Sequence, residues 1–213
     1  MKFTSYKDLI ASPWKNGGGI TRELACYPPG ASFDGFLWRV SIAEVSQSGP
    51  FSRFSGIDRV ITLLRGAGMK FVFDDGKITP LITPLTPYQF AGEVGLDAQL
   101  IGGVCEDFNL MLRRGAVSGE VTVLQTASTL GEKSDFLLLF SARGRWEITA
   151  ANGEVFTLEP QQTLSEGASI DVMHVRPLGA DSALISVKIM RENRIEVNAS
   201  KLALKSPPST MKD

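Results

Sequence analysis

The sequence predicts an all-β protein in which two similar antiparallel β-barrels pack together. Short stretches of alternating apolar and polar residues recur along the 213-residue chain, and helical periodicity is almost absent. Many short strands at this spacing are typical of a closed barrel or a sandwich. The third observation is a duplication, because the same order of strands and turns occurs twice.

The chain opens with a short helix-like segment, residues 6–10, before the strands begin. In the strand expected after Gly19, Arg22 falls on the side that is otherwise apolar, where a charge is seldom buried unless it is paired. Over residues 36–45 the alternation is regular. One face carries Trp38, Val40 and Ile42, and the other carries Arg39, Ser41 and Ala43.

The duplication consists of two similar segments, residues 59–81 and residues 135–158. Each segment predicts an apolar strand, a turn with a basic residue and glycine, a second strand, another turn and a third strand. The later turns are Asp75-Gly76 and Asn152-Gly153, dipeptides that favour hairpins. Two such units predict two similar domains.

The boundary between these domains is expected near residues 115–119. We expect residues 1–115 to form the N-terminal barrel, residues 116–191 the C-terminal barrel, and residues 192–213 a disordered tail. The tail is polar and offers too little apolar surface to offset the entropy of ordering it.

The charge distribution excludes several partners. Lys and Arg number 22 against 23 Asp and Glu, the net charge is −1, and the basic residues are scattered. We therefore expect no nucleic acid and no membrane as a partner. The chain shows no secretory signal and no run near the roughly 20 apolar residues of a membrane span, so the cytoplasm is its expected location. Cys26 and Cys105 are expected to be buried thiols.

Several catalytic sites lack their residues. The single histidine, His174, excludes sites that need two or three imidazoles, and in its alternating strand it is expected to be structural or at the surface. The glycine triplet, residues 17–19, lacks the Lys-Ser/Thr of a phosphate loop. Residues 12–15 match the SxxK pattern of a serine nucleophile, but its helix and companion motifs are missing. No metal and no cofactor are predicted.

Four stretches together carry a family resemblance: residues 13–23, 36–68, 87–93 and 107–115. In this order they resemble the HutD/Ves family, double-barrel proteins of the cupin class in bacteria. The resemblance covers most of residues 1–190. It implies a bicupin fold of two jelly-roll barrels and a link to histidine utilisation or to cold and stress induction, with the Ves branch somewhat closer. A role suggested for the family, and therefore implied by the resemblance, is to sense or limit a histidine-breakdown intermediate such as formylglutamate.

Cupin enzymes commonly hold a metal through the motif G-x5-H-x-H-x3,4-E-x6-G. Counting from Gly49 places Ser55 and Ile57 at the two histidine positions, with no acidic residue where the glutamate should follow. The resemblance therefore implies a first barrel without the metal site of its class. His174 alone cannot restore that site in the second barrel.

A small barrel without a metal can still bind one ligand between apolar walls and a few polar groups. Arginine binds carboxylates through two parallel hydrogen bonds, so converging arginines favour an anionic metabolite. The candidate walls are Trp14, Trp38, Phe51, Phe54 and Phe90, the candidate donors are Asn16, Arg22, Arg39, Arg59, Asn109 and Arg113, and the candidate acceptor is Glu93.

Several of these residues also have a purely structural interpretation. Trp14 and Trp38 are large enough to be simple core residues. Arg59 follows an aspartate and could pair with a surface carboxylate. Arg113 and Arg114 are adjacent in a strand and point to opposite faces, so at most one enters a given pocket.

Three functions remain open. The favoured one is a non-enzymatic protein with a regulatory or stress-related role, which binds a small carboxylate through Arg22, Arg59 or Arg113. The second is a metal-independent enzyme that uses Glu93 or Asp107 as general base. The third is a protein-interaction module.

Overall fold

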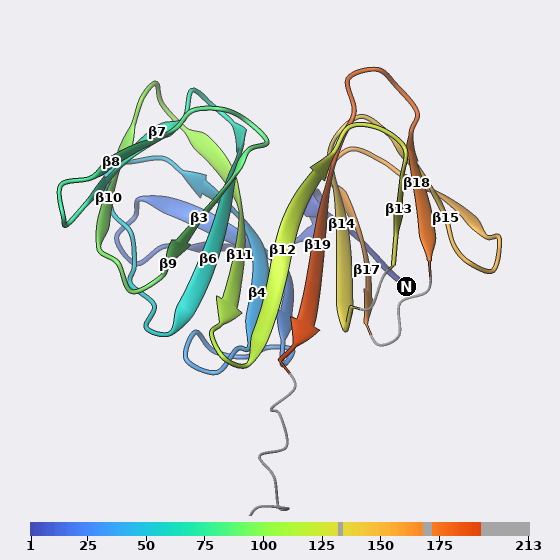
Figure 1. The fold of residues 1–213 in the computed structure, drawn as a ribbon. Helices are drawn as coiled ribbons and strands as arrows, with labels where there is room; N and C mark the ends of the chain where they lie inside the picture. The colour runs from blue at the N-terminus through green and yellow to red at the C-terminus, as the bar shows by residue number, and fades with distance from the viewer. Residues whose placement is uncertain (132–133, 168–171, 193–213) are drawn as a thin grey trace, which may run out of the picture.

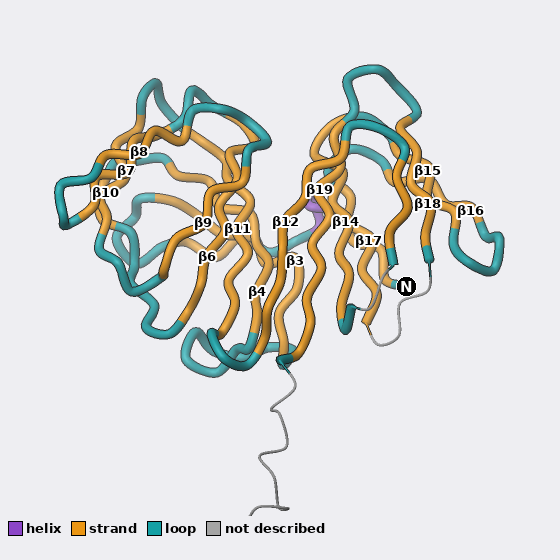
Figure 2. Tube along the Cα trace, in the orientation of Figure 1, coloured by secondary structure: helices purple, strands orange, loops and turns teal. Residues whose placement is uncertain are grey.

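The computed structural model describes residues 1–131, 134–167 and 172–192, which form 19 β-strands and one short 3-10 helix (Figures 1 and 2). The described residues contain no α-helix, so the predicted all-β class is confirmed. None of them lies in a helix long and apolar enough to cross a membrane. Apart from Glu192, the predicted disordered tail lies outside the described residues.

The elements follow one another with short connections. The first part of the chain forms β1 (Lys2–Ser5), η1 (Tyr6–Asp8), β2 (Ala11–Pro13), β3 (Gly19–Tyr27), β4 (Trp38–Val45), β5 (Gly49–Pro50), β6 (Ile57–Arg65), β7 (Met69–Phe73), β8 (Ile78–Leu81), β9 (Pro87–Ala91), β10 (Leu96–Leu100) and β11 (Cys105–Arg113). The second part forms β12 (Val117–Leu124), β13 (Ser128–Leu130), β14 (Phe136–Arg143), β15 (Trp146–Thr149), β16 (Val155–Leu158), β17 (Gln162–Gly167), β18 (Met173–Pro177) and β19 (Ala183–Arg191).

Four sheets stack as four layers (Figure 1). The outer N-terminal sheet has the order β5-β10-β7-β8, and the inner N-terminal sheet has the order β2-β3-β4-β11-β6-β9. The inner C-terminal sheet, β1-β17-β14-β19-β12, packs against the other face of the inner N-terminal sheet, and the outer C-terminal sheet, β13-β18-β15-β16, is the last layer. The expected closed barrels are not seen as closed sheets, because within the described ranges the edge strands of each inner sheet have no hydrogen-bonded partner in the outer sheet.

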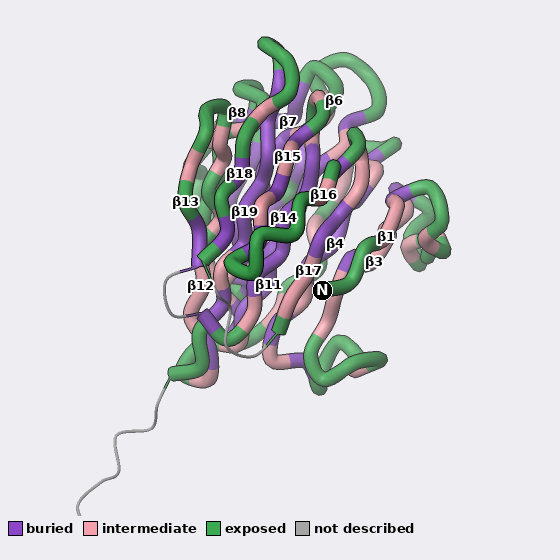
Figure 3. Tube along the Cα trace, turned by 90° about the vertical axis from the view of Figure 1, so that its right-hand side faces the viewer, coloured by how far each residue is buried: buried purple, intermediate pink, exposed green. Residues whose placement is uncertain are grey.

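The apolar core lies between these layers. The cluster between the two inner sheets includes Val40 and Phe108 from the N-terminal half and Phe140 and Val187 from the C-terminal half. Further clusters fill the space between the facing sheets of each half. Figure 3 shows the buried residues along the strands and the exposed residues in the connecting loops. Inner strands are therefore buried on both faces, which explains their long apolar runs.

The two faces predicted for residues 36–45 are confirmed in β4. Trp38, Val40 and Ile42 all belong to the cluster between the inner sheets. Because side chains alternate along a strand, Arg39 and Ser41 face the outer N-terminal sheet instead. This pattern gives the N-terminal half an interior that contains polar groups.

The duplicated segments form corresponding elements. In both halves a long strand of the inner sheet, β6 or β14, is followed by a hairpin of the outer sheet, β7-β8 or β15-β16. Gly76 and Gly153 both have φ of 83°, as the predicted hairpin turns require. The side chains of Asp75 and Asn152 accept hydrogen bonds from the backbone N–H two residues further on, at 2.9 and 3.0 Å. The turns thus form from local chemistry in each copy.

The N-terminal segment connects the two halves. β1 pairs with β17, from Lys2 opposite Ser165 to Ser5 opposite Gln162, and so extends the inner C-terminal sheet. β2, only a few residues later, pairs with β3 in the inner N-terminal sheet. The expected N-terminal unit, residues 1–115, therefore begins with a strand that lies in the other half, a pairing that no local pattern reveals.

At Gly19, the last residue of the glycine triplet, the surroundings leave no room for a side chain. A Cβ at this position would collide with the carbonyl oxygen of Glu44 and would lie 3.2 Å from the indole ring of Trp14. That indole is held in place, because its Nε1 donates to Thr21 Oγ1 at 2.8 Å. We expect Gly19→Ala to lower the free energy of unfolding by about 1–3 kcal/mol in urea titrations, as overpacking does.

Gly17→Ala is the matched control in the same loop. Gly17 has φ of +72° but no atom within 4 Å of an added Cβ, so its cost is only the backbone strain, about 1 kcal/mol. Equal losses in the two variants would contradict the steric explanation.

Candidate functional site

The inner N-terminal sheet presents polar side chains toward the outer N-terminal sheet. Arg39 on β4 and Arg59 on β6 both lie opposite Met111 of β11. Phe90 on β9 lies opposite Arg59. Asn109, two residues before Met111, shares this face because side chains alternate along β11. Two arginines and an amide thus share the face that lines the interior of the N-terminal half.

Arg59 is the centre of this group. It is only 6 % exposed, and its guanidinium donates to Asn109 Oδ1 from Nε at 3.4 Å and from Nη2 at 3.1 Å. Its Cζ lies 5.1 Å from the ring centroid of Phe90 and 5.6 Å from those of Phe51 and Phe54. Ring faces attract a cation, so the three phenylalanines stabilise the charge in part.

Arg59 has no carboxylate partner among the described residues, since none lies within 4.0 Å of its guanidinium nitrogens. Arg39 differs, because its Nε lies 2.8 Å from Glu23 Oε2. A buried charge costs several kcal/mol unless it is paired. Burial accordingly lowers the pKa of Arg59 to about 10. A bound anion would therefore stabilise the buried Arg59 charge.

Asp107 extends the chain of contacts behind Asn109. Asn109 Nδ2 donates to Asp107 Oδ1 at 3.1 Å, while the buried Oδ2 has no hydrogen-bond partner among the described residues. Asp107 is 1 % exposed. Desolvation therefore raises the pKa of Asp107 to about 7, and the Asn109 hydrogen bond and the Arg59 charge oppose this only in part. The carboxyl group titrates near neutrality.

This titration predicts a pH-dependent stability. The pKa of Asp107 rises from 3.8 to about 7 on folding, so the folded protein binds the proton more tightly. Stability should therefore fall as pH rises from about 4 to about 7, by up to about 4 kcal/mol. Urea unfolding of wild type and Asp107→Asn at pH 5 and pH 8 measures the difference. The same pH dependence in both proteins would contradict this assignment.

Five of the predicted site residues lie together at this centre: Phe51, Phe54, Arg59, Phe90 and Asn109. Trp14 adjoins them through Phe51, since the two rings meet edge to face with centroids 6.1 Å apart. These residues come from β6, β9, β11 and the loops after β2 and β5.

Arg22 and Trp38 lie on the opposite face of the inner N-terminal sheet. Arg22 Nη1 donates to the hydroxyl of Tyr6 at 3.2 Å, and Tyr6 belongs to the cluster between the inner sheets. A β-bulge between Glu23 and Ala25 shifts the alternation of β3. Trp38 packs on Phe136 of the other half, with ring centroids 4.2 Å apart.

The remaining predicted residues stabilise loops and surface. Asn16 Oδ1 accepts a hydrogen bond from the Gly18 N–H at 3.0 Å. Arg113 donates to the backbone carbonyl oxygens of Phe36 at 2.8 Å and of Asp34 at 2.9 Å.

Glu93 is exposed and lies 2.7 Å from Arg114, which also pairs with Asp58. The Arg114 hydrogen bonds lower the pKa of Glu93, which does not suit a general base at neutral pH.

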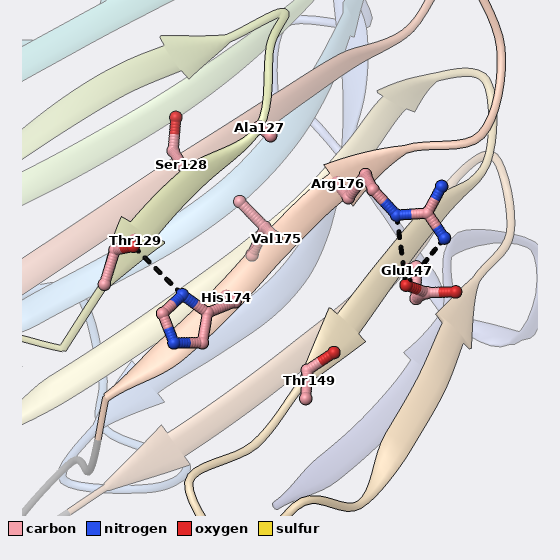
Figure 4. A pocket seen from close by; sticks show the side chains of 8 residues that line it. All are labelled: Ala127, Ser128, Thr129, Glu147, Thr149, His174, Val175 and Arg176. Atoms are coloured by element: carbon pink, nitrogen blue, oxygen red, sulfur yellow. Dashed lines mark hydrogen bonds and ion pairs between the residues drawn. The ribbon is translucent and has the colours of Figure 1, made fainter.

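A hollow of about 320 Å³ lies elsewhere, on the outer C-terminal sheet (Figure 4). Its lining includes His174, whose Nδ1 lies 3.0 Å from Thr129 Oγ1, and Arg176, whose Nη2 donates to Glu147 Oε1 at 2.8 Å. His174 is exposed, as expected for a surface residue. The ionic groups of this hollow are already paired and in contact with solvent, so the Arg59 centre is the stronger candidate.

The profile of the HutD family matches residues 6–176. The chain belongs to the HutD family. It is 38% identical over 149 residues to an uncharacterized 21.2 kDa protein in the hutC 3′ region of Pseudomonas putida, covering 70% of this chain and 77% of that protein. It is 34% identical over 169 residues to Protein Ves of Cronobacter sakazakii, covering 79% and 89%. The resemblance carried by the motifs is confirmed.

Solved structures agree with this membership. A conserved protein of unknown function from Pseudomonas aeruginosa PAO1 has a TM-score of 0.80 at 28% identity, covering 89% of this chain and 98% of its own. HutD from Pseudomonas fluorescens SBW25, in a formate condition, has 0.78 at 28%, covering 90% and 98%. A cupin 2 conserved barrel domain protein from Leptotrichia buccalis has 0.56 at 9%, covering 90% and 96%. The fold is therefore cupin-like.

The metal site common among cupin enzymes does not fit the residues of this HutD-family chain. Ser55 and Ile57 stand at the two histidine positions, and His174 lies on an outer face of the other half. Among the described residues, no three His, Cys, Asp or Glu side chains gather as a metal site would require. The interior instead contains guanidinium groups, which repel a cation.

Two features of this HutD-family site were not predicted from the sequence. Asp107 was considered only as a base, although its place two residues before Asn109 in one strand already puts both on the same face. Glu23 was not considered at all. It lies opposite Ser41 on the face of β4 that also carries Arg39, a placement that depends on how β3 pairs with β4.

Proposed function

We propose that this HutD-family protein binds a small carboxylate-bearing metabolite through Arg59, in the interior of the N-terminal of two cupin-type units. One observation carries the proposal: Arg59 is buried without a carboxylate partner among the described residues. Burial of a guanidinium without a direct carboxylate partner lowers stability, and Asp107, which reaches it only through Asn109, compensates in part. The presence of Arg59 is therefore understandable if a ligand supplies a direct negative charge.

The geometry around Arg59 suits a carboxylate. Asn109 Oδ1 accepts from Nε and Nη2 and thereby orients the guanidinium. The hydrogen-bond contacts of the described residues leave the Nη1 side of the guanidinium without an acceptor. Arginine presents its remaining N–H groups in a planar fork that matches the two oxygens of a carboxylate.

The aromatic rings provide the apolar walls. Phe51, Phe54 and Phe90 surround the guanidinium, and Phe51 and Phe54 lie in the loop between β5 and β6. Both are only half-buried, and we propose that a ligand reaches Arg59 past this loop. An apolar wall with few polar groups is typical of small-molecule sites.

The biological role rests on names of relatives. One relative lies in a hutC 3′ region, another is Protein Ves, and a structural neighbour is named HutD. Through the hut names, they are the basis on which we propose a role linked to histidine utilisation. The regulatory or stress-related character of that role stays a prediction. The cytoplasmic location stays a prediction.

Isothermal titration calorimetry of the full chain tests the binding proposal. The ligands are formate, acetate, glutarate, histidine, urocanate, formiminoglutamate and formylglutamate. We expect submillimolar binding of at least one larger acid, and its loss in Arg59→Met. Arg53→Met is the matched control, because Arg53 is an exposed arginine of the same loop, paired with Asp74. The proposal fails if no acid binds below millimolar or if Arg59→Met binds as wild type does.

A metal-independent enzyme is the second candidate, and the Asp107 carboxyl favours it. A carboxyl group with a pKa of about 7 suits a general base. Turnover of any bound acid should then be lost in Asp107→Asn and kept in Glu93→Gln. Turnover that survives in Asp107→Asn would exclude Asp107 as the base.

A further inference from the structure

We propose that an anion binds at Arg59 together with a proton, which Asp107 takes up, so that the site holds its ligand more tightly at acidic than at alkaline pH. This inference rests on the proposed function and describes how the same site would be regulated. It concerns the link between two buried groups and not the identity of the ligand.

The two groups are connected by one side chain. Asn109 accepts from Arg59 through Oδ1 and donates to Asp107 through Nδ2, so the guanidinium and the carboxyl group lie at the two ends of one amide. All three are nine-tenths or more buried. Charges at such a spacing interact strongly where water is excluded.

The surroundings of Asp107 offer few other charges. On β4 and β6 it lies opposite Ala43 and Leu63. The cluster on this side includes apolar side chains from the outer N-terminal sheet, among them Met69, Phe71 and Ala98.

The titratable or charged groups near Asp107 are few: Arg59 on β6, Cys105 and Glu106 on β11, and Arg39 on β4 with its partner Glu23 on β3. Arg39 is already neutralised by Glu23, and Glu106 contacts Tyr6 and Arg65. Arg59 is thus the cation on which a charged Asp107 depends.

An anion bound to Arg59 weakens the stabilisation that the guanidinium charge gives to the Asp107 carboxylate. The guanidinium charge is then shared with the ligand, and a second negative charge lies near Asp107. Like charges in one buried site favour protonation of one of them. Asp107 Oδ2, which has no partner among the described residues, is free to hold the proton. The net charge of the ligand, Arg59 and Asp107 together then stays at zero.

The pH window follows from the free site. The pKa of Asp107 is about 7 before the ligand binds, and the ligand raises it further. Below about pH 7 the proton is already present and the affinity is constant. Above it, each unit of pH should weaken binding by up to about tenfold, until the pKa of the occupied site is reached.

The experiment measures acetate binding to the full chain by calorimetry at pH 6, 7.5 and 8.5. Simple carboxylic acids are ionised throughout this range. We expect the affinity to fall at least about tenfold from pH 6 to pH 8.5. At pH 7.5 the heat should also differ between triethanolamine and Tris, two buffers whose charged forms are cations and cannot compete for the anion site, in proportion to a proton taken up from the buffer.

Two variants locate the proton. Asp107→Asn should bind with nearly the same affinity at all three pH values, whereas Glu106→Gln, its neighbour on the opposite face of β11, should retain the pH dependence. The buffer comparison in wild type needs no variant, so it decides the matter even if Asp107→Asn does not fold.

The outcomes separate the two proposals. Binding that is independent of pH and of buffer, or that releases a proton, would overturn the coupling and leave the Arg59 site intact. If neither acetate nor any larger acid binds wild type at any pH, the Arg59 site itself is refuted and the coupling with it.

Discussion

Replacing the three buried polar side chains that are linked by hydrogen bonds, through Arg59→Met, Asn109→Leu and Asp107→Leu, is expected to stabilise the protein while abolishing carboxylate binding. The three groups are buried, and in the part of the chain that the structure describes no carboxylate lies within ion-pair distance of the guanidinium. Exchange of buried charged groups for apolar ones of similar size often raises stability by about 1–4 kcal/mol. When Arg59, Asn109 and Asp107 are all replaced together, none of the three polar groups is left buried without its hydrogen-bond partner. Urea unfolding and calorimetry measure the two effects.

The control for this result is Arg39→Met. Arg39 is paired with Glu23, so its loss leaves the Glu23 carboxylate without its partner and should not stabilise the fold. A triple variant that is less stable than wild type by more than about 1 kcal/mol would mean that Arg59, Asn109 and Asp107 stabilise the folded protein without a ligand. The explanation through a ligand would then lose its basis.

Trp38→Ala is expected to destabilise the protein by about 3–5 kcal/mol without changing its carboxylate affinity. Trp38 is 7 % exposed and packs between the inner sheets, against Phe136 of the C-terminal half and in a stack with Tyr27. Truncation removes a large aromatic contact and leaves a cavity at the junction of the halves. The site lies on the other face of the sheet, so it keeps its geometry in the folded fraction. Urea unfolding and acetate titration test both parts.

Phe3→Ala is the matched aromatic truncation at the surface. Phe3 is 45 % exposed, and its ring centroid lies 5.5 Å from that of Phe156 on β16, an edge strand of the outer C-terminal sheet. A loss of about 1 kcal/mol or less is therefore expected. A folded Trp38→Ala protein that binds carboxylates markedly more weakly would instead return Trp38 to the ligand site.

Local sequence patterns predicted much of the fold. The Asp75-Gly76 and Asn152-Gly153 turns form because glycine accepts positive φ and the preceding side chain bonds the backbone, which neighbouring residues decide by themselves. The faces of β4 follow from simple alternation. By contrast, the bulge in β3 and the pairing of β1 with β17 depend on distant strands.

The candidate site shows the same division. Arg59 and Asn109 were among the polar residues that the motifs supplied, and they meet. Arg22 and Trp38 looked equally suitable, because a charge or a large ring on an alternating strand does not reveal which neighbouring sheet it faces. Both faces of the inner N-terminal sheet are buried, so burial alone could not separate a ligand wall from an interface residue.

By itself, the sequence determined the all-β class, the duplicated strand order, the family and the set of polar residues from which a site could be built, because these depend on residue type and local spacing. Only the tertiary structure decided that Arg59 is buried without a carboxylate partner among the described residues, that Asn109 joins it to Asp107, and that Arg22 and Trp38 belong to the junction of the halves. These outcomes depend on which strands pair and which sheets face each other, and such contacts join residues far apart in the chain.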